Sequence, residues 1–187
     1  MPPCLRYSAF RFLIAFWVVL LPATSFFAAP KPASQPLTTV PHVELQRYAG
    51  RWYEIARYPT RFEKDCDHDV TADYALQTNG KLSVINTCLT VAGKIKQSKG
   101  SAKIADASTN AKLKVTFFWP FYGDYWIIDL DPHYDYAVVG EPSRNYLWIL
   151  SRKAKLSDAT YNEIISRLPD KGYDASRLMK TTQTATK

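Results

Sequence analysis

The feature that most constrains the fold is a close, regular series of β-rich segments that begins at Gly50 and ends at Ser151. Turn residues separate the segments, and Asn79-Gly80 is the strongest of these hairpin signals. Short strands at this spacing favour an all-β fold, an eight-stranded antiparallel up-and-down barrel whose closure removes exposed strand edges. The eight predicted strands are Arg51–Tyr58, Val70–Leu76, Leu82–Val91, Lys94–Ile104, Leu113–Trp119, Tyr125–Leu130, Tyr134–Val139 and Tyr146–Ser151.

A C-terminal α-helix is predicted after the strands. Ser157 is suited to the N-cap position, and Asp158 in the first turn suits the helix dipole. Pro169 and Gly172 then end the helix. A short ninth strand is predicted over Arg177–Thr181. The apolar residues that recur at helical spacing are Tyr161, Ile164, Ile165 and Leu168.

Residues 1–29 have the pattern of an export signal. Arg6 and Arg11 precede the apolar run Phe12–Leu21, small residues follow, and no acidic residue occurs up to Ala29. An uncleaved membrane anchor is the alternative, because the apolar stretch approaches the roughly 18 residues needed to cross a bilayer. We therefore predict a signal peptide at 1–29, a Pro-rich linker at 30–42 and one domain at 43–183.

The charge pattern and the reactive residues argue against several functions. The formal net charge is +7, but the basic residues are scattered singly, so we expect no nucleic-acid partner. His42, His68 and His133 lie far apart, and no metal-ligand spacing, phosphate loop or nucleophile motif occurs. The cluster Cys66-Asp67-His68-Asp69 lies in a turn-rich segment where such residues are common. We expect no catalytic residues, no metal and no cofactor.

The cysteines predict one disulfide. Cleavage of the signal would remove Cys4 and leave the even pair Cys66 and Cys88 in an oxidising compartment. Cys66 must bend back from the loop before the second strand to reach Cys88. Two free thiols are the alternative.

Three motifs resemble those of the lipocalin family. They are Gly50-Arg51-Trp52, Asp135-Tyr136 and the segment Tyr146–Arg152. The resemblance implies that Gly50 allows a tight start of the first strand and that Trp52 fills the closed end of the barrel. It also implies that Arg152 stacks on Trp52, a cation–π contact worth roughly 1–2 kcal/mol if desolvated.

The resemblance is strongest to bacterial lipocalins of the Blc type, apolipoprotein D and plant temperature-induced lipocalins. It implies binding, storage or transport of fatty acids or lysophospholipids and a role in maintaining the cell envelope. Bacterial members typically carry a lipid on a Cys after the signal, whereas no Cys follows the apolar run here. We therefore expect export to the periplasm, with an uncleaved anchor or an outer-membrane location as alternatives. A lipid-modifying enzyme, membrane association and a homodimer are left open.

Alternation along the first and eighth strands supplies some of the pocket candidates, whereas Phe117, Trp119 and Trp126 lie near the turn between the fifth and sixth strands, where it does not fix their facing. If Arg152 points to the closed end, Tyr146, Trp148 and Leu150 share its face, and by the same parity Glu54 and Tyr58 share the face of Trp52. Aromatic residues make up 14% of the chain and either fill a core or line a pocket. Basic residues that could attract a carboxylate or phosphate, or simply face solvent, are Arg51, Arg57 and Arg61. The predicted pocket residues are Glu54, Tyr58, Phe117, Trp119, Trp126, Tyr136, Tyr146 and Trp148.

Overall fold

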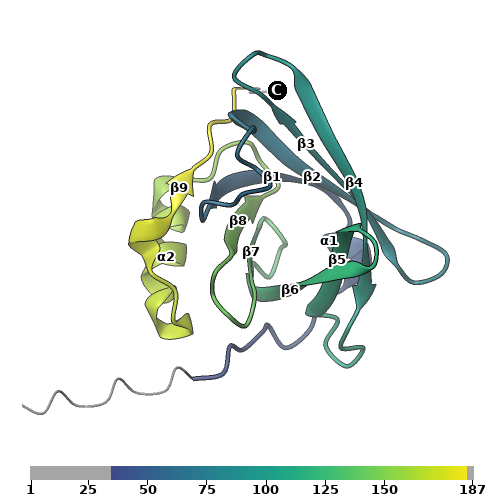
Figure 1. Ribbon diagram of the computed structural model, residues 1–187. Helices are drawn as coiled ribbons and strands as arrows, with labels where there is room; N and C mark the ends of the chain where they lie inside the picture. The colour runs from purple at the N-terminus through teal and green to yellow at the C-terminus, as the bar shows by residue number, and fades with distance from the viewer. Residues whose placement is uncertain (1–34, 185–187) are drawn as a thin grey trace, which may run out of the picture. The chain divides into compact units, whose positions relative to one another are not determined.

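Eight antiparallel strands close into a barrel, with a ninth strand hydrogen-bonded outside it and one helix alongside (Figure 1). The computed structural model describes residues 35–184, so the predicted signal and the first part of the linker lie outside the described residues. Closure comes from the pairing of β1 with both β2 and β8. The strands are β1 (Gly50–Arg57), β2 (His68–Leu76), β3 (Leu82–Leu89), β4 (Ile95–Ile104), β5 (Lys112–Phe118), β6 (Phe121–Leu130), β7 (Tyr136–Gly140), β8 (Leu147–Ser151) and β9 (Met179–Lys180).

The eight-stranded barrel confirms the predicted fold class. Each neighbouring pair from β2 to β8 is antiparallel and consecutive, as an up-and-down meander requires. The predicted Asn79-Gly80 turn joins β2 to β3, with Gly80 at φ 76°. The largest difference lies in β6, which begins at Phe121 rather than Tyr125 because it continues the hairpin from β5 through Phe118 and Phe121.

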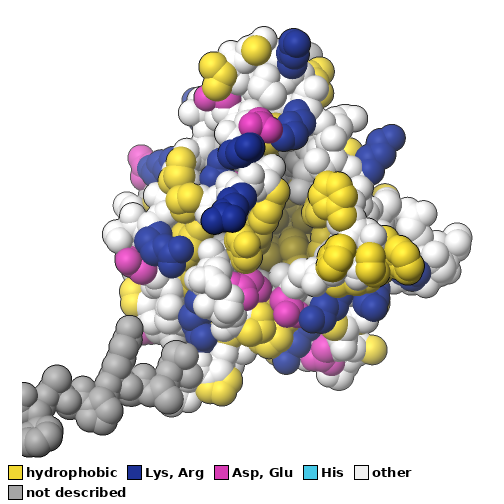
Figure 2. All heavy atoms as spheres, in the orientation of Figure 1, with side chains coloured by type: hydrophobic (Ala, Val, Ile, Leu, Met, Phe, Trp, Pro, Cys, Tyr) yellow, Lys and Arg dark blue, Asp and Glu magenta, His cyan; other side chains and the backbone are white. Residues whose placement is uncertain are grey.

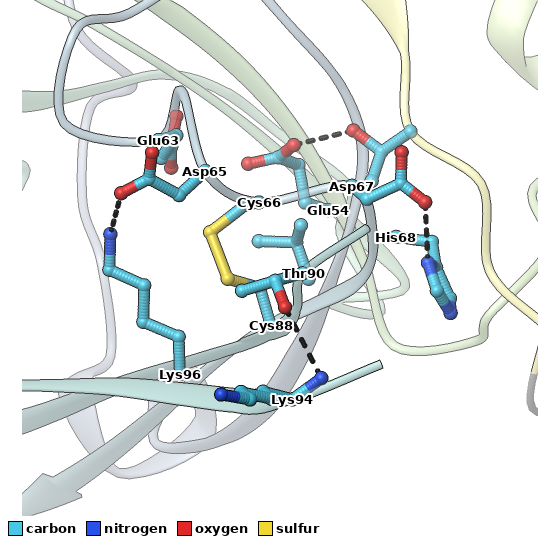
Figure 3. Close-up of a disulfide and its surroundings, with 12 residues drawn as sticks. Glu54, Glu63, Asp65, Cys66, Asp67, His68, Cys88, Thr90, Lys94 and Lys96 are labelled. Carbon is cyan, nitrogen blue, oxygen red and sulfur yellow. Dashed lines mark hydrogen bonds and ion pairs between the residues drawn. A yellow bond between two sulfur atoms is a disulfide. The ribbon is translucent and has the colours of Figure 1, made fainter. Parts of the chain in front are cut away.

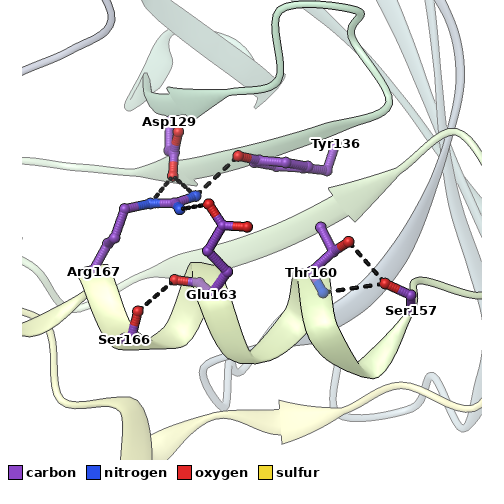
Figure 4. Close-up of polar contacts among 7 residues, drawn as sticks. All are labelled: Asp129, Tyr136, Ser157, Thr160, Glu163, Ser166 and Arg167. Carbon is purple, nitrogen blue, oxygen red and sulfur yellow. Dashed lines mark hydrogen bonds and ion pairs between the residues drawn. The ribbon is translucent and has the colours of Figure 1, made fainter.

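The helix α2 (Asp158–Arg167) lies against the outside of the barrel, and a second hydrophobic layer fills the space between them. The predicted N-cap is confirmed, since the Ser157 hydroxyl accepts a hydrogen bond from the Thr160 amide at 3.1 Å. Arg167 joins the helix to the barrel, because its guanidinium donates to Asp129 and to the Tyr136 hydroxyl (Figure 4). After α2, two short 3₁₀ turns, η1 (Pro169–Lys171) and η2 (Ala175–Arg177), lead into β9.

The C-terminal segment completes the wall between β1 and β2. The two strands pair only from Gly50 to Tyr53, so their other halves diverge. The Gln183 side-chain amide donates to the carbonyl of Glu54 at 2.9 Å and to that of Val70 at 2.8 Å, one on each strand. The segment around Gln183 thus bridges the place where the pairing of β1 with β2 stops.

A short helix, α1 (Leu45–Tyr48), covers the closed end of the barrel and was not among the predicted elements. The side chain of Trp52 is fully buried there, and its indole donates to the Tyr48 carbonyl at 2.8 Å. The Arg152 guanidinium lies 3.8 Å from the Trp52 ring centroid, which is the contact that the family resemblance implied. Gly50 has φ 97°, a backbone conformation that glycine adopts readily. An added Cβ would also lie only 3.3 Å from the Arg152 guanidinium, so both the backbone angle and the limited space favour glycine.

Residues 35–42, part of the Pro-rich segment, pack on the barrel although they form neither helix nor strand. Leu37 is buried in the layer beneath α2, and the Val40 amide donates to the Ile127 carbonyl at 3.0 Å. The apolar residues between the prolines therefore hold this segment in place.

A disulfide joins Cys66 to Cys88, as the cysteine count predicted (Figure 3). The Cα atoms are 5.6 Å apart, and Asp67 also donates its amide to the Leu89 carbonyl. The bond attaches the loop between β1 and β2 to the end of β3 at the open end of the barrel.

We expect Trp52→Ala to lower the free energy of unfolding by about 3–5 kcal/mol, because a buried indole would be replaced by a cavity. Urea unfolding followed by circular dichroism measures this change. Trp119→Ala is the matched control, since Trp119 is 80% exposed and its loss should change stability by about 0.5 kcal/mol or less. Equal urea midpoints for wild type and Trp52→Ala would contradict the placement of Trp52.

Loss of the disulfide in a Cys66→Ala/Cys88→Ala variant should lower the free energy of unfolding by about 3 kcal/mol, given the separation of 22 residues. Reductant should destabilise the wild type to a similar extent and leave the double variant unchanged. Quantitative alkylation of both cysteines in the folded protein without reductant would show that the bond does not form.

Candidate ligand-binding cavity

The barrel holds a cavity of about 700 Å³ that opens between the loops opposite α1. Figure 2 shows it as a hollow bordered by hydrophobic side chains. The size lies in the range of small-molecule sites, roughly 300–1,000 Å³. Most of the wall is apolar because inward positions of seven different strands or loops contribute aliphatic and aromatic side chains, among them Phe62, Val70, Val84, Val115, Phe121 and Leu150.

Four of the predicted pocket residues line this cavity. Glu54, Phe117, Tyr146 and Trp148 contribute to its wall. The rings of Tyr146 and Trp148 stack with centroids 5.9 Å apart, as expected for neighbours on one face of β8. Trp119 is not part of the wall; it lies at the tip of the β5–β6 hairpin with its side chain in solvent.

Tyr58 was expected in the cavity, but the structure places it in the layer beneath α2, with its hydroxyl donating to the Asp174 carbonyl at 2.7 Å. The reason is a β-bulge between Glu54 and Ala56, where the pairing of β1 with β8 shifts by one residue. A shift of one residue moves the following side chains to the opposite face. Trp52 and Glu54 therefore point inward, whereas Ala56 and Tyr58 point toward the helix.

Trp126 and Tyr136, also predicted for the pocket, likewise pack in the outer layer. Trp126 follows Tyr125, which points inward, so strand alternation directs it outward, with the Lys112 ammonium 4.5 Å from its ring centroid. Tyr136 precedes Ala137, which is in the inner core, and its hydroxyl accepts from Arg167. Neither is retained among the proposed ligand contacts. Asp135, in the same motif, contributes its backbone carbonyl, which accepts from the Arg152 amide.

A cluster of three tyrosine hydroxyls lies at the floor of the cavity, with Tyr74 and Tyr125 in the cavity wall, and no sequence pattern predicted it. Tyr125 lies 2.7 Å from the Tyr48 hydroxyl and 3.0 Å from that of Tyr74. Burial raises the pKa of Tyr74 to about 12 and raises the pKa values of Tyr48 and Tyr125 well above 10. The floor is therefore uncharged. The three residues lie on α1, β2 and β6, so single-strand alternation could not bring them together.

A buried group of Glu54, Arg57 and Glu63 borders the upper part of the cavity. Arg57 Nε lies 3.2 Å from Glu54 Oε1 and 3.3 Å from Glu63 Oε2, and the Thr181 hydroxyl donates to Glu54. Burial, together with the negative charge of Glu63, raises the pKa of Glu54 to about 8. At neutral pH, Glu54 is therefore mostly protonated, and Arg57 balances Glu63.

The three basic residues considered for a head group have different surroundings. Arg51 pairs with Asp73 on the outside of the barrel at 2.9 Å, and Arg57 is held by the two glutamates. Arg61 is exposed and lines the cavity mouth together with Lys64 and Lys96. Asn86 also lines the cavity, and its buried Oδ1 has no hydrogen-bond partner among residues 35–184. A ligand could therefore meet cations at the mouth and one free acceptor further in.

The described part of the chain offers neither a metal site nor a membrane-spanning helix. No group of three or more His, Cys, Asp or Glu residues there could hold a metal ion. No helix among the described residues has the length and apolar character needed to cross a membrane.

The sequence is similar to several proteins of established families. It is 42% identical over 158 residues to temperature-induced lipocalin-1 of Arabidopsis thaliana, covering 80% of this chain and 84% of that protein. It is 42% identical over 153 residues to the outer membrane lipoprotein Blc of Escherichia coli K12, covering 81% and 85%. Mouse apolipoprotein D is 35% identical over 150 residues, with coverage of 75% and 77%.

Solved structures share the fold. Insecticyanin from the tobacco hornworm Manduca sexta superposes with a TM-score of 0.62 at 23% identity, covering 80% of this chain and 84% of that one. Lobster apocrustacyanin A1 gives a TM-score of 0.61 at 19% identity, covering 75% and 80%. A family model described as a lipocalin-like domain matches residues 43–183. With that match, and with relatives at 42% identity over four fifths of its length, this chain belongs to the lipocalin family.

Proposed function

We propose that this protein binds one lipid molecule, a fatty acid or a lysophospholipid, inside the barrel and carries or stores it in the cell envelope. Lipocalins are binding proteins rather than enzymes, and the chain is a member of that family. The observation that supports the proposal most directly is the large, mostly apolar cavity, which is open at one end and ends in an uncharged floor.

The size of the hydrophobic effect makes this binding reasonable. Burial of an acyl chain of about 16 carbons contributes roughly 12 kcal/mol at about 0.8 kcal/mol per methylene. Association and ordering cost about 4–15 kcal/mol. The balance corresponds to a dissociation constant near the micromolar range.

The arrangement of polar groups supports one orientation of the ligand. The cavity floor and lower wall offer Tyr74, Tyr125 and Leu150 to an acyl chain, whereas Arg61 and Lys64 stand at the mouth. We propose that the acyl chain enters first and that its carboxylate or phosphate remains near these cations. The proposed ligand contacts are therefore Glu54, Tyr74, Phe117, Tyr125, Tyr146 and Trp148.

We also propose export to the periplasm, with residues 1–29 as the signal and 43–183 as the lipid-binding domain. Support comes from the basic and apolar pattern of the first residues and from the relatives named as outer membrane lipoproteins. A disulfide between Cys66 and Cys88 suits an oxidising compartment.

Trp148→Ala should weaken binding of palmitate or a 16-carbon lysophospholipid by about tenfold, because an aromatic wall of the cavity is lost. Isothermal titration calorimetry measures the affinity, and circular dichroism confirms folding. Trp126→Ala is the matched control: it removes the same side chain from outside the cavity and should leave the affinity within about twofold. Binding weaker than about 100 micromolar for every acyl ligand would contradict the carrier function. Turnover of labelled lysophospholipid would instead indicate a lipid-modifying enzyme.

Fractionation of cells that express the full chain should place a shortened protein, beginning between Phe26 and Ala33, in the periplasmic fraction. The reason is that cleavage after the apolar run removes the only strongly apolar segment near the N-terminus. N-terminal sequencing identifies the first residue. A membrane-bound protein that still begins at Met1 would show that the segment is an anchor.

A further inference from the structure

The exposed hydrophobic side chains of this protein gather at the open end of the barrel. Among the described residues, ten large hydrophobic side chains are exposed, and only Leu76 and Met179 lie elsewhere. We call the loops 58–67, 90–94, 119–120 and 141–146, with the strand ends next to them, the open rim. The eight exposed hydrophobic residues on the open rim are Phe62, Val91, Ile95, Phe118, Trp119, Phe121, Tyr122 and Tyr146.

The β5–β6 hairpin is the most prominent part of the open rim. Phe118, Trp119 and Phe121 are 79%, 80% and 78% exposed, and Figure 2 shows hydrophobic side chains gathered beside the hollow. A barrel hairpin with one face toward the interior and the other in water alternates apolar and polar residues, whereas this one is aromatic on both faces. Contiguous exposed apolar patches of this kind mark sites of interaction with a partner or a membrane.

Three cations on the open rim take no part in ion pairs among the described residues. Arg61, Lys64 and Lys94 are exposed and have no ion-pair partner within residues 35–184. Each carboxylate in the rim loops has a partner: Asp65 pairs with Lys96 at 2.8 Å and Glu63 with Arg57 at 3.3 Å, Asp67 contacts His68, and Glu141 accepts hydrogen bonds from its own loop.

We infer that the open rim docks on an anionic lipid bilayer, with Trp119 and its hairpin in the headgroup layer and the cavity mouth facing the membrane. Aromatic side chains favour the membrane–water interface, and nearby Lys and Arg add attraction to anionic lipids. Lys103 places a further positive charge beside the aromatic hairpin, since its ammonium lies 4.4 Å from the Tyr122 ring centroid. A lipid could then move between bilayer and cavity without crossing water.

The first test measures whether Trp119 enters the bilayer. The full chain is mixed with phosphatidylcholine–phosphatidylglycerol vesicles whose acyl chains are either brominated or plain, and tryptophan emission is recorded. Trp119→Phe is measured in parallel, and the difference between the two proteins isolates Trp119 from the other tryptophans and from any membrane binding by residues 1–29. Bromine should reduce the Trp119 emission at least about twofold. Unchanged Trp119 emission, or absence of the protein from the vesicles, would overturn the inference.

The second test separates docking from lipid binding. Val91→Glu/Trp119→Glu changes two exposed residues that do not line the cavity, and Leu76→Glu is the control at the closed end of the barrel. Transfer of a fluorescent 16-carbon fatty acid from the same vesicles should slow about tenfold or more in the double variant and stay unchanged in the control. Affinity for the same probe added as monomer should be equal in all three proteins.

The outcomes of these tests are distinct. If no protein binds the monomeric probe while Trp119 is still quenched, the proposed lipid carrier function fails and the docking surface stands. Equal transfer rates in wild type and double variant would overturn docking even if lipid binding is confirmed. Concentration-dependent dimerisation that shields Trp119 without vesicles would assign the open rim to a second copy of the chain and would also overturn the inference.

Discussion

The contact between Arg152 and Trp52 holds the closed end of the barrel together, and the cavity depends on it. Arg152 lies over the Trp52 ring and donates to the carbonyls of Arg51, Tyr48 and Ala49. Because these carbonyls belong to the end of α1 and the start of β1, one side chain directly after β8 fixes the floor, the first strand and the last barrel strand together. Charge-assisted hydrogen bonds and cation–π stacking are strong when water is excluded, as it is around the buried indole.

The bulge in β1 turns the side chains of the two halves of the strand toward different parts of the molecule. Before it, Trp52 and Glu54 face the inside of the barrel; after it, Ala56 and Tyr58 face α2. A regular strand would have continued the inner face and placed the Tyr58 ring in the cavity. The bulge therefore leaves room for a ligand inside while giving the helix a hydrophobic surface outside.

The sequence predicted the barrel, the helix, the motif contact and the disulfide because each depends on a local pattern or on a specific residue pair. Strand alternation and the Asn79-Gly80 turn define the meander, and Ser157 identifies the helix start. Tyr58 could not be placed in this way, because a bulge changes the face of a strand without changing its composition. The hydroxyl cluster of Tyr48, Tyr74 and Tyr125 could not be predicted from the sequence either, since its members become neighbours only when three distant segments meet.

The side chain of Gln183 joins β1 to β2 in the barrel wall. The two carbonyls that accept from its amide belong to strands that no longer pair with each other at this height. Backbone hydrogen bonds support the same bridge, because the Thr181 amide donates to the Ile55 carbonyl and the Thr182 carbonyl accepts from the Asp69 amide. Fusion of a tag or a partner domain directly after this residue would therefore act on the segment that joins β1 to β2, and a spacer would leave these hydrogen bonds undisturbed.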